Sequence, residues 1–350
     1  MEEYIHKNKI GGNTMNIRRQ ILFICTICFI LCGVQNVQAQ EPSQYKTYEG
    51  FEYSYSSSKD CIYIMKYTGT AAYVTVPAYI DGKEVRYLCD AFKNNTTIKK
   101  VELPNTLVDI GRFTECTALE EIVIPNKVKK ISTYAFYGCK SLKNVQFSNG
   151  LLDIGNNSFT GCNSLKEVVI PNTVTSLGAA TFSNCTTLQK VVLSKNIDSI
   201  GSRVFYNCKK LKTIPLPKKV YIIKEEAFAG CKSLQKIKFP SAMAYIEAYA
   251  FRGCGLKQIV LPKNMLSIEE GAFSDCKKLK KIVIKSKGIE TWRGYNENKA
   301  EEDQEEESLK DLVFYNIHKK AVFDVPNSCI KKYKEWLIET GCFKKTMKIK

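Results

Sequence analysis

Cysteine recurs along this sequence at a nearly fixed interval. The members of the series are 23 residues apart up to Cys254, and Cys276 follows 22 residues later. The full series is Cys116, Cys139, Cys162, Cys185, Cys208, Cys231, Cys254 and Cys276. A fixed period of this length indicates a solenoid, in which each repeat packs only on its neighbours. The 350-residue chain therefore need not divide into globular domains of average size.

A longer pattern surrounds each of these cysteines. A phenylalanine lies three residues before it, a leucine usually lies three residues after it, and an alternating apolar triplet and often a proline follow. The phenylalanines predict nine turns, at Phe92, Phe113, Phe136, Phe159, Phe182, Phe205, Phe228, Phe251 and Phe273. Asn95 takes the place of the cysteine in the first turn. Short deletions before Phe113 and after Cys254 are expected to fall in loops.

The apolar triplet predicts which side chains face the core. Because side chains alternate along a strand, Val168 and Ile170 are expected to face inward and Val169 outward. Turns stacked about 4.8 Å apart would join these strands into one parallel sheet. We expect one short strand per turn, and a short helical turn at the Ala-Phe-x-x-Cys segment on the other side. Pro215 falls at an outward strand position and lacks an N–H donor, so the ladder should be irregular there.

The repeat consensus resembles a known family. The pattern Leu-x-x-Ile/Val-x-Ile/Leu-Pro-x-x-Val-x-x-Ile-x-x-x-Ala-Phe-x-x-Cys is similar to the BspA-type leucine-rich repeats over roughly residues 70–285. Residues 50–53 and 74–82 resemble the family's N-terminal β-hairpin cap, and residues 322–326 and 333–336 resemble its C-terminal cap. The resemblance implies a leucine-rich-repeat solenoid that is secreted or held at the surface of a host-associated microbe. Adhesive binding to host proteins or other cells is described for some members.

The N-terminal segment has the pattern of an export signal. Arg18 and Arg19 precede the apolar run Ile21–Val34, and Ala39 ends a small-residue cleavage pattern. We predict a signal peptide with translation starting at Met15, and an uncleaved anchor is the alternative. No later stretch reaches about 18 apolar residues, so no membrane span is expected in the mature chain.

The expected organisation of the chain follows from these patterns. It comprises an upstream extension and signal peptide at 1–39, an N-terminal cap at 40–90, the solenoid at 91–284, an acidic insertion at 285–310 and a C-terminal cap at 311–350. The insertion contains the acidic run Glu301–Glu307. An acidic block is usually solvated, so we expect disorder or a short exposed helix, with calcium binding or partner contact as the alternative.

Three roles are open for the cysteine series: metal binding, disulfide formation, or a buried structural position. Free cysteine is among the most buried residue types, and a zinc site lacks its usual local Cys-x-x-Cys pair after the leader. In-register parallel side chains also fit disulfide torsion angles poorly. We therefore predict buried thiols. Cap disulfides joining Cys61 to Cys89 or Cys329 to Cys342 remain open.

Positive charge is the second recurring feature. The formal net charge is +17, and lysines recur at the two positions after the repeat leucine. Outward-facing valines on neighbouring turns add an apolar element. We predict ligand-binding residues at Lys143, Lys166, Lys190, Lys212, Lys236, Lys257, Lys281, Val169 and Val192. Lys100 and Lys280 occupy equivalent positions. The alternative is that the lysines only solubilise the surface and the valines only reflect strand propensity.

The sequence offers little chemistry for catalysis. His318 is the single histidine after the leader, and no motif supplies a nucleophile, base and orienting group, a phosphate-binding glycine loop or metal-ligand spacing. We expect no enzyme activity, no cofactor and no metal. The sequence predicts a monomeric, secreted or cell-surface protein that binds an extracellular protein or acidic glycan. A periplasmic or envelope scaffold is the alternative, and export makes nucleic acid an unexpected partner.

Overall fold

The computed structural model describes residues 45–289, 313–339 and 346–350. The chain divides into two compact units, Met1–Tyr45 and Lys46–Lys350, and every strand and helix described below lies in the second. The predicted signal peptide lies outside the described residues, as does the predicted acidic insertion from residue 290 onward. Within the described ranges, no helix is both long and apolar enough to cross a lipid bilayer.

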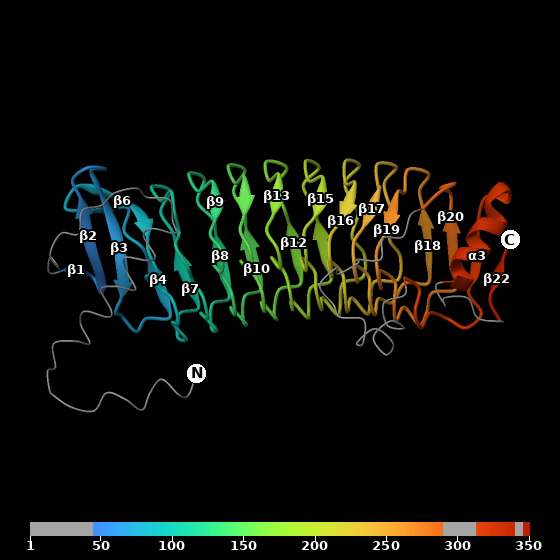
Figure 1. The fold of residues 1–350 in the computed structure, drawn as a ribbon. Coiled ribbons are helices and arrows are strands. Elements are labelled where there is room, and N and C mark those ends of the chain that lie inside the picture. Colours follow the sequence, from blue (N-terminus) through green and yellow to red (C-terminus); the bar gives the residue numbers. More distant parts are fainter. Residues whose placement is uncertain (1–44, 290–312, 340–345) are drawn as a thin grey trace, which may run out of the picture. The chain divides into compact units, whose positions relative to one another are not determined.

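The unit Lys46–Lys350 is a parallel β-solenoid whose turns follow one another in sequence order (Figure 1). The apolar triplet forms the first strand of a turn, and Val168 and Val169 pair in register with Val191 and Val192. These first strands are β7 (Lys100–Glu102), β8 (Glu121–Val123), β10 (Asn144–Gln146), β12 (Glu167–Val169), β14 (Lys190–Val192), β18 (Gln258–Leu261), β20 (Lys281–Ile284) and β21 (Val322–Asp324). The solenoid predicted from the 23-residue period is confirmed.

Most turns contain a second strand, which the sequence analysis did not anticipate. These strands are β9 (Lys130–Ile131), β11 (Asp153–Ile154), β13 (Ser176–Leu177), β15 (Ser199–Ile200), β16 (Ile222–Ile223), β17 (Tyr245–Ile246) and β19 (Ser267–Ile268). They pair in parallel, as Asp153 does with Lys130 and Ser176. The prediction of one strand per turn was therefore incomplete, because the second apolar residue after the proline position, such as Ile131, also lies in a short strand.

The Ala-Phe-x-x-Cys segment, where a short helical turn was predicted, forms successive tight turns with hydrogen bonds three residues back, as from Tyr137 N to Tyr134 O at 3.2 Å, and no regular helix. Alternate N–H groups of the segment bond to the next repeat: Tyr134 N to Asn156 O at 3.0 Å and Phe136 N to Ser158 O at 2.7 Å. An α-helix would need those donors for its own carbonyls. Tyr134 also has a φ of 60°, in the left-handed region that ends a right-handed helix.

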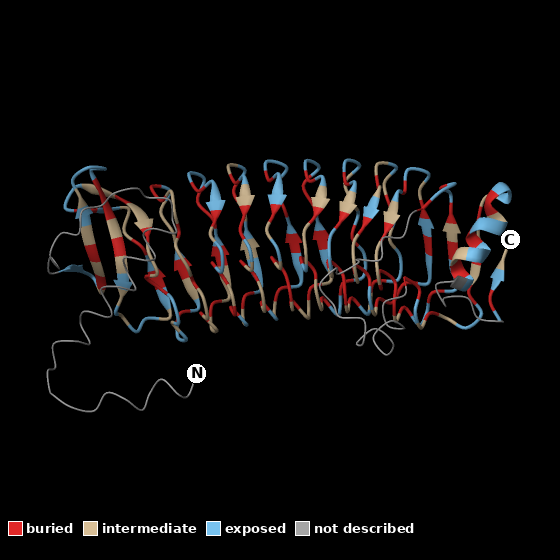
Figure 2. Cartoon of the chain, in the orientation of Figure 1, coloured by how far each residue is buried: buried red, intermediate tan, exposed pale blue. Residues whose placement is uncertain are grey.

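A column of stacked phenylalanine rings forms the centre of the core. Consecutive rings from Phe92 to Phe273 are nearly parallel, with centroids 5.1 to 5.9 Å apart. Phe314 continues the column at 5.6 Å from Phe273, so the repeat resumes beyond the insertion. Val168 is 3% exposed and Val169 is 62% exposed, which confirms the predicted alternation. Figure 2 shows buried and exposed segments alternating along the turns.

The cysteine column lies beside the phenylalanines. Each thiol of the series is buried and donates a hydrogen bond to the carbonyl oxygen of the phenylalanine one turn earlier, as Cys185 does to Phe159 at 3.1 Å. In the first turn, Asn95 Oδ1 accepts hydrogen bonds from Thr97 N and Ile98 N instead. The predicted buried structural role of the series is confirmed.

The cap disulfide considered for Cys61 and Cys89 is not formed. Neither side chain takes part in a disulfide, and the Cys89 thiol lies 3.6 Å from the sulfur of Met65. In the parallel pairing of β3 with β6, Ile62 lies opposite Val85 and Ile64 opposite Leu88, so the two cysteines lie near opposite ends of the strand pair. Cys329 is not disulfide-bonded either, while Cys342 lies outside the described residues.

The first-strand ladder is interrupted at Pro215, as predicted. Only an isolated bridge joins Lys190 to Thr213, and between β14 and β18 the described chain has no first strand. Proline lacks the N–H that a parallel ladder needs. The second-strand ladder from β15 to β19 runs past this point without a break.

Distinct elements close the two ends of the solenoid. At the N-terminal end, β1 (Lys46–Tyr48), β2 (Phe51–Ser56), β3 (Cys61–Tyr67), β6 (Lys83–Leu88) and β5 (Tyr79–Ile80) form a mixed sheet, and β4 (Tyr73–Thr75) pairs with β7. At the C-terminal end lie β21, η2 (Asn327–Cys329), α3 (Ile330–Glu339) and β22 (Lys348–Ile349). Tyr333 of α3 donates a hydrogen bond to the Ser286 carbonyl at 2.9 Å, which attaches the helix to the last regular turn.

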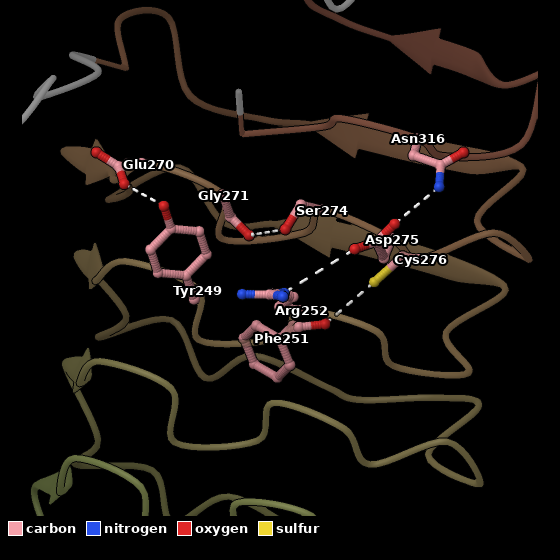
Figure 3. A network of polar contacts seen from close by, with 9 residues as sticks. All are labelled: Tyr249, Phe251, Arg252, Glu270, Gly271, Ser274, Asp275, Cys276 and Asn316. Carbon is pink, nitrogen blue, oxygen red and sulfur yellow. Dashed lines mark hydrogen bonds and ion pairs between the residues drawn. The ribbon is translucent and has the colours of Figure 1, made fainter. Parts of the chain in front are cut away.

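Polar contacts join the turn of Asn316 to the repeats before it (Figure 3). Asn316 Nδ2 donates to Asp275 Oδ1 at 2.7 Å, and Arg252 lies 3.9 Å from the other carboxylate oxygen of Asp275. Tyr249 donates to Glu270 on the neighbouring turn. Backbone bonds from Phe273 N to Val313 O and from Asp275 N to Tyr315 O extend the same ladder.

Candidate binding surface

Two polar positions recur at the same place in nine successive turns, and in seven of these turns a first strand begins at the second position. They follow a buried leucine or isoleucine and precede the first inward residue of the strand, so they lie at the solvent-facing start of the strand. We call them together the strand-start surface. In turn order the positions hold Lys99 and Lys100, Glu120 and Glu121, Lys143 and Asn144, Lys166 and Glu167, Gln189 and Lys190, Lys212 and Thr213, Gln235 and Lys236, Lys257 and Gln258, and Lys280 and Lys281.

The structure places the predicted lysines along this one surface. Lys143, Lys166, Lys190, Lys212, Lys236, Lys257 and Lys281 are all exposed. Strand pairing aligns equivalent positions of neighbouring turns, as for Glu167 with Lys190 and Gln258 with Lys281. Lys212 and Lys236 lie in turns without a first strand, but backbone bonds between turns continue there: Lys212 N donates to Gln189 O, and Lys257 N to Gln235 O, both at 3.1 Å. The ammonium groups of these lysines remain in solvent.

In the N-terminal turns, three of the lysines are paired with carboxylates. Lys100 lies 2.9 Å from Glu121, Lys143 lies 2.6 Å from Glu120, and Lys190 lies 3.4 Å from Glu167. The hydrogen bond from Lys143 lowers the pKa of Glu120, and the hydrogen bond to Glu121 raises the pKa of Lys100. These groups are open to solvent, so the pairs neutralise charge but add little to stability.

The C-terminal turns carry a different arrangement. Lys212, Lys236, Lys257, Lys280 and Lys281 form no ion pair with any residue that the structure describes. No Asp or Glu occupies the strand-start surface after Glu167. The positive charge there faces solvent without a compensating carboxylate.

The predicted valines lie on the outward face of the same strands. Val169 pairs with Val192, and their exposed fractions are 62% and 41%. Val123 and Val260 occupy the same position on other turns and are also exposed, although Gln146 separates Val123 from Val169. The apolar element is therefore a small patch beside the lysines.

The surface is shallow. An open hollow with a volume of about 350 Å³ is lined by Lys143, Asn144, Ser164, Lys166 and Glu167. A second hollow of about 230 Å³ lies one turn earlier, between Tyr73 and Lys143. Among the residues that are described, no group of three or more His, Cys, Asp or Glu side chains could hold a metal ion.

The acidic members of this surface were not predicted from the sequence. Glu120 and Glu167 each precede their lysine partners, Lys143 and Lys190, by 23 residues, which is one period of the solenoid. A search for opposite charges one period apart would have found these pairs. It also missed exposed lysines just before the repeat leucine, at Lys209, Lys210, Lys232, Lys277 and Lys278.

A solved leucine-rich repeat structure supports this architecture. A search of curated proteins finds no similar sequence. A leucine-rich repeat protein of Bacteroides ovatus is 22% identical, with a TM-score of 0.62 over 87% of this chain and 90% of that one. A leucine-rich repeat protein of T. pallidum is 25% identical, with a TM-score of 0.46 over 67% of this chain and 91% of that one. A leucine-rich cell surface protein of Faecalibacterium prausnitzii is 22% identical, with a TM-score of 0.45 over 72% and 91%.

The match to a family model is more extensive. A model of the BspA type leucine-rich repeat region, in six copies, matches residues 88–212 and 198–296. These residues make up more than half of the chain and include the cysteine series. The resemblance predicted from the repeat consensus is confirmed, and the chain belongs to the BspA-type leucine-rich repeat family.

Proposed function

We propose that this protein binds an extracellular ligand, without catalysis, through the strand-start surface and the outward face of the first strands. The observation that carries the proposal is the alignment of exposed lysines along consecutive turns that are joined by strand pairs or by single backbone hydrogen bonds. These backbone bonds between turns hold the positions in one row, so a long ligand can contact many of them without the protein reorganising. Repeat proteins commonly use such extended surfaces for binding.

The ligand we propose is an extracellular protein or an acidic glycan. The lysines attract carboxylate and sulfate groups, and clustered charge of one sign raises the association rate. Val169 and Val192 add a small area for apolar contact. We place the protein outside the cytoplasm because of the leader pattern, in which Arg18 and Arg19 precede the run Ile21–Val34.

An array of extracellular matrix proteins and acidic glycans, probed with the purified protein, tests the proposal. We expect a ligand whose binding falls at least about tenfold, equivalent to about 1.4 kcal/mol, in the variant Lys166→Ser/Lys212→Ser. The control variant, Lys129→Ser/Lys224→Ser, changes the net charge equally at exposed positions near the second strands and should bind normally. Equal loss in the two variants, or no ligand on the array, would contradict the proposal.

Cell fractionation separates this proposal from a scaffold role. Protease treatment of intact cells should remove a protein that meets its ligand outside the cell. Full protection of the protein within the envelope would instead support the periplasmic or envelope scaffold.

A further inference from the structure

Charge is distributed unequally along the strand-start surface. Its first five turns contain Glu120, Glu121 and Glu167, and three of their lysines are within 3.4 Å of one of these carboxylates. The next four turns contain lysines and neutral polar residues alone. A polyanion that approaches the first group meets carboxylates that repel it, whereas the second group presents only positive charge.

Further lysines flank the C-terminal group. Lys209, Lys210, Lys232, Lys277 and Lys278 lie between the buried cysteine and the buried leucine of their turns, and all are exposed. Tight turns fix their backbone, as shown by the bonds from Leu211 N to Cys208 O at 3.0 Å and from Leu279 N to Cys276 O at 2.8 Å. Neighbouring turns meet there too, because Ser233 N donates to Lys209 O at 3.2 Å. These side chains widen the row of lysines into a band.

We infer that this band, on the turns of Leu211, Leu234, Leu256 and Leu279, binds an acidic polysaccharide that runs along the solenoid from turn to turn. The inference rests on the proposed function and names its ligand class and position. Turns lie about 4.8 Å apart, so each turn offers at least one ammonium group to successive anionic groups of an extended chain. Lysine ammonium groups act as flexible point charges, which suits sulfates and carboxylates at variable angles.

The neutral side chains of the band favour a polysaccharide over a nucleic acid. Thr213, Gln235 and Gln258 lie between the lysines and can exchange hydrogen bonds with sugar hydroxyl groups. No aromatic side chain lies at the strand-start or outward strand positions of these four turns. Proteins that bind single-stranded nucleic acids normally provide aromatic rings for base stacking.

Two variants with the same change in charge test the position of the site. Lys212→Ser/Lys236→Ser/Lys257→Ser removes three unpaired lysines, and Lys100→Ser/Lys143→Ser/Lys190→Ser removes the three paired ones. Heparin oligosaccharide binding is measured by titration at several salt concentrations. At physiological ionic strength charges are screened over about 8 Å, so a variant should affect only anions close to it.

We expect the first variant to weaken heparin binding at least about tenfold and to lower the salt dependence of log K by about 2 to 3. The second variant should change heparin binding less than about threefold. Equal losses, a larger loss in the second variant, or no binding of heparin by the natural protein would overturn the inference. Tighter binding of poly(dT) than of heparin would overturn the ligand class. Matching thermal unfolding curves confirm that both variants fold.

Failure of this inference can be told apart from failure of the proposed function. If an array ligand binds through Lys166 and Lys212 while heparin does not bind, the proposed function stands and the inference falls. If heparin binds through the band but intact cells protect the protein from protease, the inference stands and the extracellular role falls.

Discussion

The thiol of Cys162 donates a hydrogen bond to the carbonyl oxygen of Phe136, 3.3 Å away in the preceding turn. The same oxygen accepts the N–H of Cys139 at 3.2 Å, so it joins two successive turns. Because the arrangement recurs along the series, each cysteine couples its turn to the one before. Burial raises the pKa of Cys162 well above its ordinary value, which keeps the thiol protonated and able to donate.

Replacing one thiol should weaken the stack measurably. We expect Cys162→Ala to lower the free energy of unfolding by about 1 to 2 kcal/mol, because it removes a buried sulfur and one hydrogen bond while the Phe136 oxygen keeps its bond to Cys139. Thr173→Ala, at an exposed position of the same repeat, should stay within about 0.5 kcal/mol. Urea denaturation measures both, and equal effects would contradict the proposed coupling.

The thiol series should resist modification in the folded protein. Its members are buried and hydrogen-bonded, and burial raises the pKa of Cys116 to about 12, so the reactive thiolate is scarce. Iodoacetamide should label half-buried Cys89 before any of the eight thiols from Cys116 to Cys276. Denaturation should expose all eight. Mass spectrometry of labelled peptides checks this order, and disulfides between members of the series would refute it.

Stability should fall in strong alkali because of these thiols. Burial raises the pKa of Cys185 from 9.0 to about 12, so the folded protein holds this proton more tightly than the unfolded chain. The resulting stability is complete below pH 9 and is lost as pH rises towards 12. Between pH 9.5 and 10.5, the free energy of unfolding of Cys185→Ala should fall by about 1 kcal/mol less than that of the natural protein. Identical pH slopes in urea denaturation would show that Cys185 makes no such contribution.

Neighbouring valines should respond in opposite ways to the same substitution. Val168 is 3% exposed and Val169 is 62% exposed. Val168→Asp buries an unpaired carboxylate and should lower the free energy of unfolding by about 3 kcal/mol or more. Val169→Asp should change it by less than about 0.5 kcal/mol. Thermal unfolding by circular dichroism distinguishes the two. A larger loss for Val169→Asp would mean that the strand register is wrong.

Features that recur with the 23-residue period were predicted from the sequence. The positions of Phe182 and Cys185 and the inward direction of Val168 follow from periodicity, because equivalent residues meet identical surroundings in each turn. Pro215 was predicted to disturb the ladder because its missing N–H does not depend on context.

Features that depend on non-local structure were not predicted. Ser176–Leu177 is too short to show strand alternation, so the second strand was missed. Phe314 was not assigned to the ring column because the insertion interrupts the 23-residue spacing. The bond from Tyr134 N to Asn156 of the next repeat was not predicted, because no local pattern reveals a partner one turn away.

Deletion of one whole repeat tests the stacking of equivalent turns most directly. Removing residues 163–185 joins Cys162 to Thr186 and brings Phe159 into register with Phe205, so every remaining turn keeps a complete neighbour. Removing residues 163–173 deletes about half a repeat and puts inward and outward side chains out of phase. Thermal unfolding by circular dichroism should remain cooperative after the first deletion and lose its cooperative transition after the second. Loss of folding after the whole-repeat deletion, or normal folding after the half-repeat deletion, would contradict the stacked-turn account.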